Sequence, residues 1–245
     1  MIGFAGRLIL LDIEGTVAPL AFVHEVLFPY ARSGVADFLS RHRDSTEVLK
    51  ALEQVARDSG PVTEPGTTAA VARLDAETGR AAWVARIQGL IDADAKQTGL
   101  KALQGLIWAE GYQSGRIRSH LFDDAAEALR IWHRGGMRLR IYSSGSIAAQ
   151  RLFFGHAEGG DLTGCLDAYH DTTTGPKREA ASYRAIAEAA GLPAQDILFL
   201  SDVTQELDAA QDAGCRTAWV VRPGNPAGST DRHPLLRHFA EIRLS

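Results

Sequence analysis

The chain lacks the features that mark several large classes of protein. Its 245 residues contain only two cysteines, Cys165 and Cys215, which lie far apart and lack the spacing of a metal or redox pair. We therefore expect two reduced, buried thiols in a cytoplasmic protein. No apolar run approaches the roughly 18 residues that cross a membrane. The first run leads directly into Asp12 and Glu14, so neither a membrane partner nor a secretory signal is expected.

The chain also lacks an excess of positive charge. The formal net charge is -4, and no block of lysine and arginine stands out in the sequence. General nucleic-acid binders carry a basic patch or stripe, so we expect no nucleic-acid partner. The chain has neither an internal repeat nor a low-complexity segment. These absences leave a globular protein whose partner is a small molecule, and any phosphate that it binds belongs to that molecule.

Strand-like and helix-like segments alternate towards both ends of the chain. Strands are predicted at residues 7–11, 138–142, 197–200 and 217–221, and helices at 123–134, 147–154, 178–190 and 204–213. Regular alternation of this kind is typical of strands that run parallel and are connected by helices. The sequence therefore predicts an α/β fold with a doubly wound, mainly parallel sheet at its core.

The middle of the chain differs from its ends. Between residues 22 and 115 apolar residues recur at helical spacing and no strand is predicted. Three stripes carry this pattern: Val48, Leu49, Leu52, Val55 and Ala56; Val84, Ile87, Leu90 and Ile91; Leu103, Leu106 and Ile107. Residues 59–68 contain two prolines and two glycines and are predicted to form a loop. The simplest organisation is a core of residues 1–20 and 116–245 with an all-helical insertion, residues 21–115.

Polar residues follow the predicted strands at the points where they end. Asp12-Ile13-Glu14-Gly15-Thr16 follows the first strand, Ser143-Ser144-Gly145-Ser146 the second, and a segment from Ser201 to Glu206 the third. Lys177 stands at the start of a predicted helix. Ligands of open parallel sheets bind beyond the carboxyl ends of the strands, so we expect these groups to share one site.

The residue types at these positions fit phosphoryl transfer through a covalent aspartyl phosphate. A carboxylate such as Asp12 can serve as the nucleophile and so divide one difficult step into two. Mg²⁺ prefers hard oxygen ligands, which Asp12 and Asp202 can supply. Ser143 and Ser144 offer hydroxyl and backbone N–H groups for phosphate oxygens. Lys177 adds positive charge where negative charge develops.

Each motif alone also has an ordinary structural explanation. Asp12 and Glu14 fit a turn or a helix cap, and a serine cluster is often a loop that caps a helix. Lys177 fits a solvated surface position, while Asp202 and Glu206 fit the first turn of a helix. All of these motifs occur in order and each stands at an element boundary. That combination favours function over the separate structural explanations.

The order Asp-x-Glu-Gly-Thr, Ser-Ser-Gly, Lys and Ser-Asp-x-x-x-Glu resembles the haloacid-dehalogenase-like phosphohydrolases. Longer strings are similar to the enolase-phosphatase family of the methionine salvage pathway. They are residues 10–16, 28–30, 103–108, 141–146, 153–156, 197–204 and 221–225. The resemblance covers nearly the whole chain and includes the insertion.

The resemblance implies a bifunctional, Mg²⁺-dependent enzyme of methionine biosynthesis with acireductone synthase activity. Its substrate is expected to be 2,3-diketo-5-methylthiopentyl-1-phosphate, which is enolised and then dephosphorylated to 1,2-dihydroxy-3-keto-5-methylthiopentene. The family resemblance also implies a monomer whose helical insertion forms a cap.

The same resemblance implies a role for each residue of the motifs. Glu14 departs from the Asp usual in the wider superfamily, and its extra methylene suggests the hypothesis that it serves the enolase step. By this resemblance Asp12 is the nucleophile and a metal ligand, and Glu14 contributes to the metal site and acts as acid or base. Ser143 and Ser144 bind the phosphate, and Lys177 contacts the phosphate and the nucleophile. Asp202 binds Mg²⁺, with Glu206 in support.

Three alternatives remain open. The first is a phosphatase of the same fold that acts on another small phosphorylated metabolite. The second is a dehalogenase, which needs neither Mg²⁺ nor an acidic residue at position 14. The third is an inactive binding or scaffold protein, which is expected to lose Asp12, Lys177 or Asp202. All three residues are present.

Overall fold

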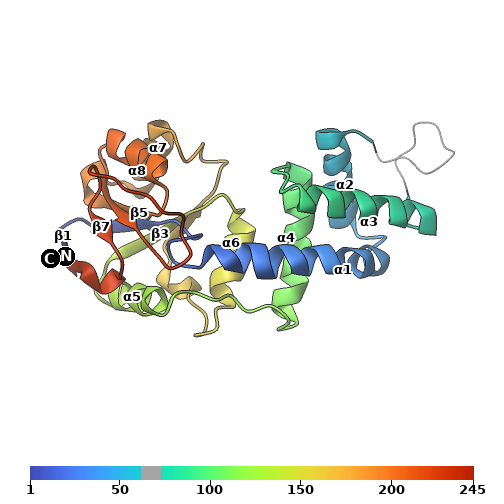
Figure 1. Ribbon diagram of the computed structural model, residues 1–245, viewed down its shortest axis with the longest axis horizontal. Helices are drawn as coiled ribbons and strands as arrows, with labels where there is room; N and C mark the ends of the chain where they lie inside the picture. Colours follow the sequence, from blue (N-terminus) through green and yellow to red (C-terminus); the bar gives the residue numbers. More distant parts are fainter. Residues whose placement is uncertain (62–72) are drawn as a thin grey trace. The chain divides into compact units, whose positions relative to one another are not determined.

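The computed structural model describes residues 1–61 and 73–245, which form two compact units (Figure 1). Residues 1–23 and 118–245 form the first, called here the α/β unit, and residues 24–117 form the helical unit. The chain thus passes between units at 23/24 and 117/118, whereas the sequence predicted 20/21 and 115/116.

A six-stranded sheet, parallel throughout, lies at the centre of the α/β unit. In spatial order its strands are β4 (Ala168–His170), β3 (Arg138–Tyr142), β2 (Leu8–Leu11), β5 (Ile197–Ser201), β6 (Arg216–Val220) and β7 (Leu235–Leu236). Strand β2 occupies the interior because all four of its side chains are apolar and 0% exposed, which suits a strand covered on both faces. Leu11 pairs with Ile141 on one side and with Leu200 on the other. The carboxyl ends of β2, β3 and β5 therefore meet at one edge of the sheet.

Helices cover both faces of this sheet, which confirms the predicted doubly wound α/β fold. Helices α7 and α8 pack on the face that carries Leu8, Leu10 and Phe199, and α5 lies across the opposite face (Figure 1). The helices of the unit are α5 (Asp123–Arg134), α6 (Ile147–Gly155), α7 (Ala180–Ala190) and α8 (Thr204–Asp212), with short 3₁₀ turns η2 (Thr163–Cys165), η3 (Ala194–Asp196) and η4 (Phe239–Glu241). Gly191 ends α7 in the left-handed conformation, with φ of 65°, which glycine adopts without a steric cost.

The predicted elements of the α/β unit agree with the structure within two residues at either end, and α5 and β3 agree at both ends. The sequence did not reveal β4 or β7, nor a second, two-stranded parallel sheet. That sheet pairs β1 (Ile2–Phe4) with β8 (Ile242–Leu244) and so joins the two ends of the chain. These strands have only two or three residues, too few for an alternating pattern to be recognised.

The helical unit has no strand among residues 24–61 and 73–117, as predicted. A π-helical segment, η1 (Phe22–Leu27), leads from the α/β unit into α1 (Phe28–Arg41), which is followed by α2 (Thr46–Ser59), α3 (Glu77–Asp92) and α4 (Thr98–Gln113). Val35, Leu52, Trp83 and Leu103, one from each of these α-helices, are members of a single apolar core. The predicted stripe on α2 was wrong at Leu49, whose side chain is 41% exposed because it lies off the buried face.

Three further predictions concern loops, thiols and membranes. The predicted loop 59–68 lies, from residue 62 onward, outside the described residues, and Ser59 is the last residue of α2. Both cysteines are free thiols; Cys215 is buried as predicted, whereas Cys165 is only partly buried because it lies in the η2 turn. Among the described residues, no helix combines the length and apolar character needed to cross a membrane.

Candidate active site

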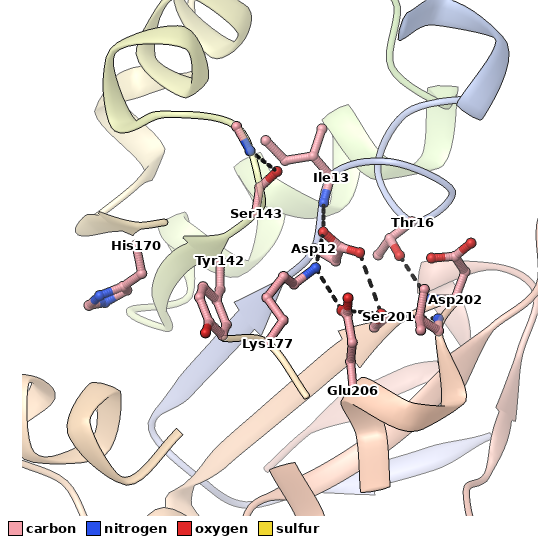
Figure 2. A network of polar contacts seen from close by, with 12 residues as sticks. Asp12, Ile13, Thr16, Tyr142, Ser143, His170, Lys177, Ser201, Asp202 and Glu206 are labelled. Carbon is pink, nitrogen blue, oxygen red and sulfur yellow. Dashed lines mark hydrogen bonds and ion pairs between the residues drawn. The ribbon is translucent and has the colours of Figure 1, made fainter. Parts of the chain in front are cut away.

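Asp12 lies at the carboxyl end of the central strand, where β2 gives way to a tight loop. Its backbone N–H still donates to the Leu200 carbonyl, with an N–O distance of 3.0 Å, so Asp12 remains in register with β5. The Ile13 N–H donates to Asp12 Oδ1 at 2.8 Å. The side chain is buried, and this backbone contact holds its carboxylate towards the end of the sheet (Figure 2).

The Lys177 ammonium joins two carboxylates at this strand end. Its Nζ lies 2.7 Å from Asp12 Oδ1 and 2.6 Å from Glu206 Oε2 (Figure 2). Burial is the largest single influence on Lys177 and opposes its charge, but the charges and hydrogen bonds of the two carboxylates together raise its pKa to about 12. The Tyr183 hydroxyl donates to the Lys177 carbonyl at 2.7 Å and so anchors the backbone beneath the ammonium. Lys177 is a buried, fixed cation.

Ser201, the last residue of β5, bridges the same two carboxylates. Its Oγ lies 3.4 Å from Asp12 Oδ2 and 3.1 Å from Glu206 Oε2, and it accepts the Val203 N–H at 3.1 Å. One hydroxyl proton can serve only one of the carboxylates at a time. Burial, followed by the charge of Asp12, raises the pKa of Glu206, while Lys177 opposes this shift. One cation thus neutralises part of the charge of two buried acids.

Asp202 follows Ser201 and is held by its backbone against the loop after β2. Its N–H donates to Thr16 Oγ1 at 3.1 Å, and its carbonyl accepts the Trp219 Nε1–H at 2.9 Å. Gly15, with φ of 70°, lets the loop approach closely, since a Cβ atom there would lie 2.2 Å from Asp202 Oδ2. Only a glycine permits this separation between loop and carboxylate.

The Asp202 carboxylate is poorly compensated. Its Oδ1 is buried and has no hydrogen-bond partner within the described part of the chain. Burial raises the pKa of Asp202 to about 7, with a further contribution from the charge of Asp12 and a smaller one from Glu14. Two acids that repel each other, one with an unsatisfied buried oxygen, form a donor set that suits a cation.

The side chains alone do not complete a metal site. Residues 1–61 and 73–245 contain no group of three His, Cys, Asp or Glu side chains placed to hold a metal ion, so Asp12, Glu14 and Asp202 do not form such a group. Mg²⁺ usually keeps several waters and takes only one or two carboxylates from the protein. The pair Asp12 and Asp202 therefore fits a divalent cation whose other ligands are water or backbone oxygens.

The predicted phosphate-binding serines differ in their surroundings. Ser143 is buried at the end of β3; its N–H donates to the His170 carbonyl at 3.2 Å and its Oγ accepts the Gly145 N–H at 3.3 Å. Figure 2 shows Ser143 just beyond the end of β3, near Asp12 at the end of β2. Ser144 is exposed one residue further along the loop. The hydroxyl proton of Ser143 remains available for a phosphate oxygen, because Oγ uses only its acceptor side in this contact.

Sequence reasoning missed two parts of this arrangement. It named Ser201 and Thr16 only as members of motifs, although their hydroxyls connect Asp12, Glu206 and the Asp202 backbone. A hydroxyl residue within four positions of a strand-end carboxylate is the signal that could have revealed both. It also placed Glu206 in a supporting role, whereas Glu206 and Asp12 contact the Lys177 ammonium equally closely.

Comparisons with known proteins agree with this geometry. Residues 7–214 match the model of the haloacid dehalogenase-like hydrolase family. Enolase-phosphatase E1 of Pseudomonas aeruginosa strain LESB58 is 49% identical over 236 residues, which are 96% of this chain and 97% of that protein. The chain belongs to the enolase-phosphatase family. Enolase-phosphatase E1 of Sorangium cellulosum is 45% identical over 99% of both chains. These matches confirm the family that the sequence motifs indicated, and they confirm that the chain is a hydrolase.

Solved structures extend the comparison to three dimensions. The UTR4 protein of Saccharomyces cerevisiae shares 34% sequence identity with a TM-score of 0.76, covering 95% of this chain and 98% of that one. A dehalogenase with an intermediate complex has a TM-score of 0.54 at 16% identity, covering 97% of this chain and 96% of that one, and so shares the fold alone. Phosphatases of the haloacid-dehalogenase-like family are typically metal-dependent, which agrees with the poorly compensated Asp202.

Proposed function

We propose that this chain is a Mg²⁺-dependent enolase-phosphatase of methionine salvage. It converts 2,3-diketo-5-methylthiopentyl-1-phosphate to 1,2-dihydroxy-3-keto-5-methylthiopentene. Identity of 49% over 96% of the chain to an enolase-phosphatase supports this substrate. The observation that carries the chemistry is the buried Asp12 carboxylate, which is 2.7 Å from the Lys177 ammonium and lies beside the poorly compensated Asp202.

In this proposal Asp12 attacks phosphorus, the bond between phosphorus and the ester oxygen of the substrate breaks, and the product leaves with that oxygen and takes up a proton. Water then attacks the phosphorus of the aspartyl phosphate, which releases inorganic phosphate and frees the Asp12 carboxylate. Among the described residues, Asp12 Oδ1 has two short contacts, to Ile13 N–H and Lys177 Nζ, whereas Oδ2 has one long contact, to Ser201 Oγ. The carboxylate is therefore held in one orientation before the substrate arrives, which is the main requirement for rapid phosphoryl transfer. Lys177 stabilises negative charge on the nucleophile and on the phosphoryl group.

Asp12 and Asp202 would hold the Mg²⁺ ion, with Glu14 nearby and water or backbone oxygens as further ligands. When bound, the ion polarises the substrate carbonyl and the phosphoryl oxygens as a Lewis acid. Ser143 and Ser144 bind phosphate oxygens. Glu14 is the proposed acid or base of the enolisation, because its longer side chain distinguishes this chain from the wider superfamily.

The helical unit is proposed to serve as the cap that excludes bulk water during the reaction. A monomer is proposed as the working form. A second candidate, phosphatase action on another small phosphorylated metabolite, uses the same Asp12 and Lys177 and differs only in lacking the enolase step.

The proposal is tested by offering the purified protein the diketo phosphate with Mg²⁺ and, separately, with a chelator. Enol absorbance and phosphate release are followed independently. Enol formation before phosphate release, both abolished by the chelator, is expected. Phosphate release without an enol intermediate, or turnover of sugar phosphates alone, would establish the plain phosphatase instead. Glu14→Asp should slow enolisation more than dephosphorylation, and equal losses would contradict the special role of Glu14.

A further inference from the structure

Two side chains from the loop after β6 donate to the backbone of the loop after β2. Asn225 Nδ2 lies 2.9 Å from the Gly15 carbonyl oxygen, and Arg222 Nε lies 3.1 Å from the Thr16 carbonyl oxygen. Some 210 and 206 residues of sequence separate the partners of these two bonds, so neither is a product of local chain geometry. Neither donor contacts Asp12 or Asp202 directly.

Arg222 is itself held rigidly, so it can fix the position of the Thr16 carbonyl that it contacts. Its guanidinium packs over the rings of Phe122 and Phe239, with distances from Cζ to the ring centroids of 4.7 and 4.4 Å. Its Nη1 lies 2.8 Å from Asp124 Oδ2, and both side chains are less than 10% exposed. Asp124 Oδ2 also accepts the Phe239 N–H at 2.8 Å. A buried guanidinium that has a charged partner and two aromatic faces has little freedom to move.

The loop that these donors hold follows one acid of the site and binds the backbone of the other. Residues 13–16 follow Asp12 directly, and Thr16 Oγ1 accepts the Asp202 N–H. A Cβ atom on Gly15 would lie 2.2 Å from Asp202 Oδ2, so the backbone of the loop passes close to the Asp202 carboxyl group. A shift of the Gly15 and Thr16 carbonyls therefore changes the distance and orientation between the carboxylates of Asp12 and Asp202.

We propose that Asn225 and Arg222 are positioning residues, which hold the Gly15 and Thr16 carbonyls so that Asp12 and Asp202 are spaced for a divalent cation. This inference rests on the proposed metal site. Both residues act through the loop backbone, and in the described part of the chain neither hydrogen-bonds to Asp12 or Asp202. Residues that orient metal ligands without binding the metal typically change its affinity about 10- to 100-fold when they are replaced.

The test measures binding of Mn²⁺ and Mg²⁺ to the full chain by calorimetry, without substrate. Asn225→Ala is the main variant because Asn225 is only partly buried and its loss leaves no buried charge. It should weaken cation binding about tenfold or more. Arg222→Lys, which keeps the charge beside Asp124, should weaken it as well, since an ammonium cannot make the same set of directed bonds.

Thr217→Val is the matched control. Thr217 Oγ1 lies 2.8 Å from His233 Nδ1, both residues are buried, and this pair does not contact the loop after β2. Removal of this hydrogen bond should lower Tm by about 2 to 4 °C, as for any loss of about 1 kcal/mol in a chain of this size. Cation affinity in Thr217→Val should equal that of the wild type.

The outcomes separate this inference from the proposed function. Weaker cation binding in Asn225→Ala, with wild-type affinity in Thr217→Val, supports the positioning role. Equal affinity in Asn225→Ala and the wild type overturns it and leaves the metal site intact. A parallel loss in Thr217→Val shows a general loss of stability and also overturns it. A wild type that binds neither cation overturns the metal site and the inference together.

Discussion

Replacement of Lys177 by methionine tests whether the charge of Lys177 stabilises the two buried carboxylates that it contacts. The wild-type cluster holds one cation between the carboxylates of Asp12 and Glu206, at 2.7 and 2.6 Å. Lys177→Met keeps most of the side-chain volume and removes the charge. The two buried acids then face each other with no cation between them, and Ser201 can donate to only one of them.

The cost of this change follows from the burial of all three groups. Removal of one partner from a buried ion pair typically destabilises a protein by about 3 to 5 kcal/mol, because the other charge is left uncompensated. At about 2 to 4 °C per kcal/mol for a chain of this size, Tm should fall by roughly 6 to 20 °C at neutral pH. The loss should shrink in acid, because protonation of a carboxylate removes the repulsion.

A double variant separates charge balance from catalysis. Lys177→Met with Glu206→Gln returns the formal charge of the cluster to that of the wild type. Thermal melts should show that the double variant regains much of the lost Tm, whereas phosphate release should stay at the level of the single variant because the cation beside Asp12 is still absent. Unchanged Tm in Lys177→Met, or a double variant less stable than the single one, would show that the charge of Lys177 does not stabilise the two buried carboxylates.

Three further predictions concern pH and the Gly15 loop. The pKa of Asp202 rises from 3.8 to about 7 on folding, so the metal-free fold retains a proton that the unfolded chain has lost. Stability in chelator should therefore fall as pH rises from about 4 to about 7. Asp202→Asn should flatten that slope in thermal melts, and an unchanged slope would contradict the assignment. Burial, followed by the charge of Arg140, lowers the pKa of His170 from 6.5 to about 4, so its effect has the opposite sign. Stability is lost as pH falls from 6.5 towards about 4, and His170→Gln should lose less over that range. Gly15→Ala should cost about 1 to 2 kcal/mol of backbone strain, plus the clash with Asp202 and loss of activity. Gly191→Ala, at a similar φ of 65° with no atom within 4 Å of the added Cβ, should show the strain alone, and equal effects would remove the argument for close approach.

The parts of the fold that the sequence predicts are those with strong periodicity. Strand β2 is a continuous apolar run, and α5 combines an apolar face with a glycine stop. The pairing of β1 with β8 is a contact between the two ends of the chain, and three residues per strand leave no pattern to recognise. Leu49 was misplaced because the predicted stripe was wider than the face that α2 buries.

Some features of the site can likewise be predicted from the sequence, and others cannot. Carboxylates directly after strands, such as Asp12 and Asp202, can be found from sequence because parallel strands bring their carboxyl ends together. The bridging role of Ser201 and the donation from Asn225 to Gly15 cannot, since they depend on side-chain directions and on contacts between distant segments. The nearly equal distances from the Lys177 ammonium to the Asp12 and Glu206 carboxylates likewise depend on three-dimensional packing.

Direct attack of Asp12 on phosphorus is the step on which the proposed mechanism depends. The stereochemical course at phosphorus tests it, with a substrate whose thiophosphate group is made chiral by isotopic oxygen and with labelled water as the acceptor. Attack by Asp12 followed by attack by water comprises two in-line displacements, so net retention of configuration is expected in the released thiophosphate. Inversion would show a single displacement by water and would exclude an aspartyl phosphate on Asp12.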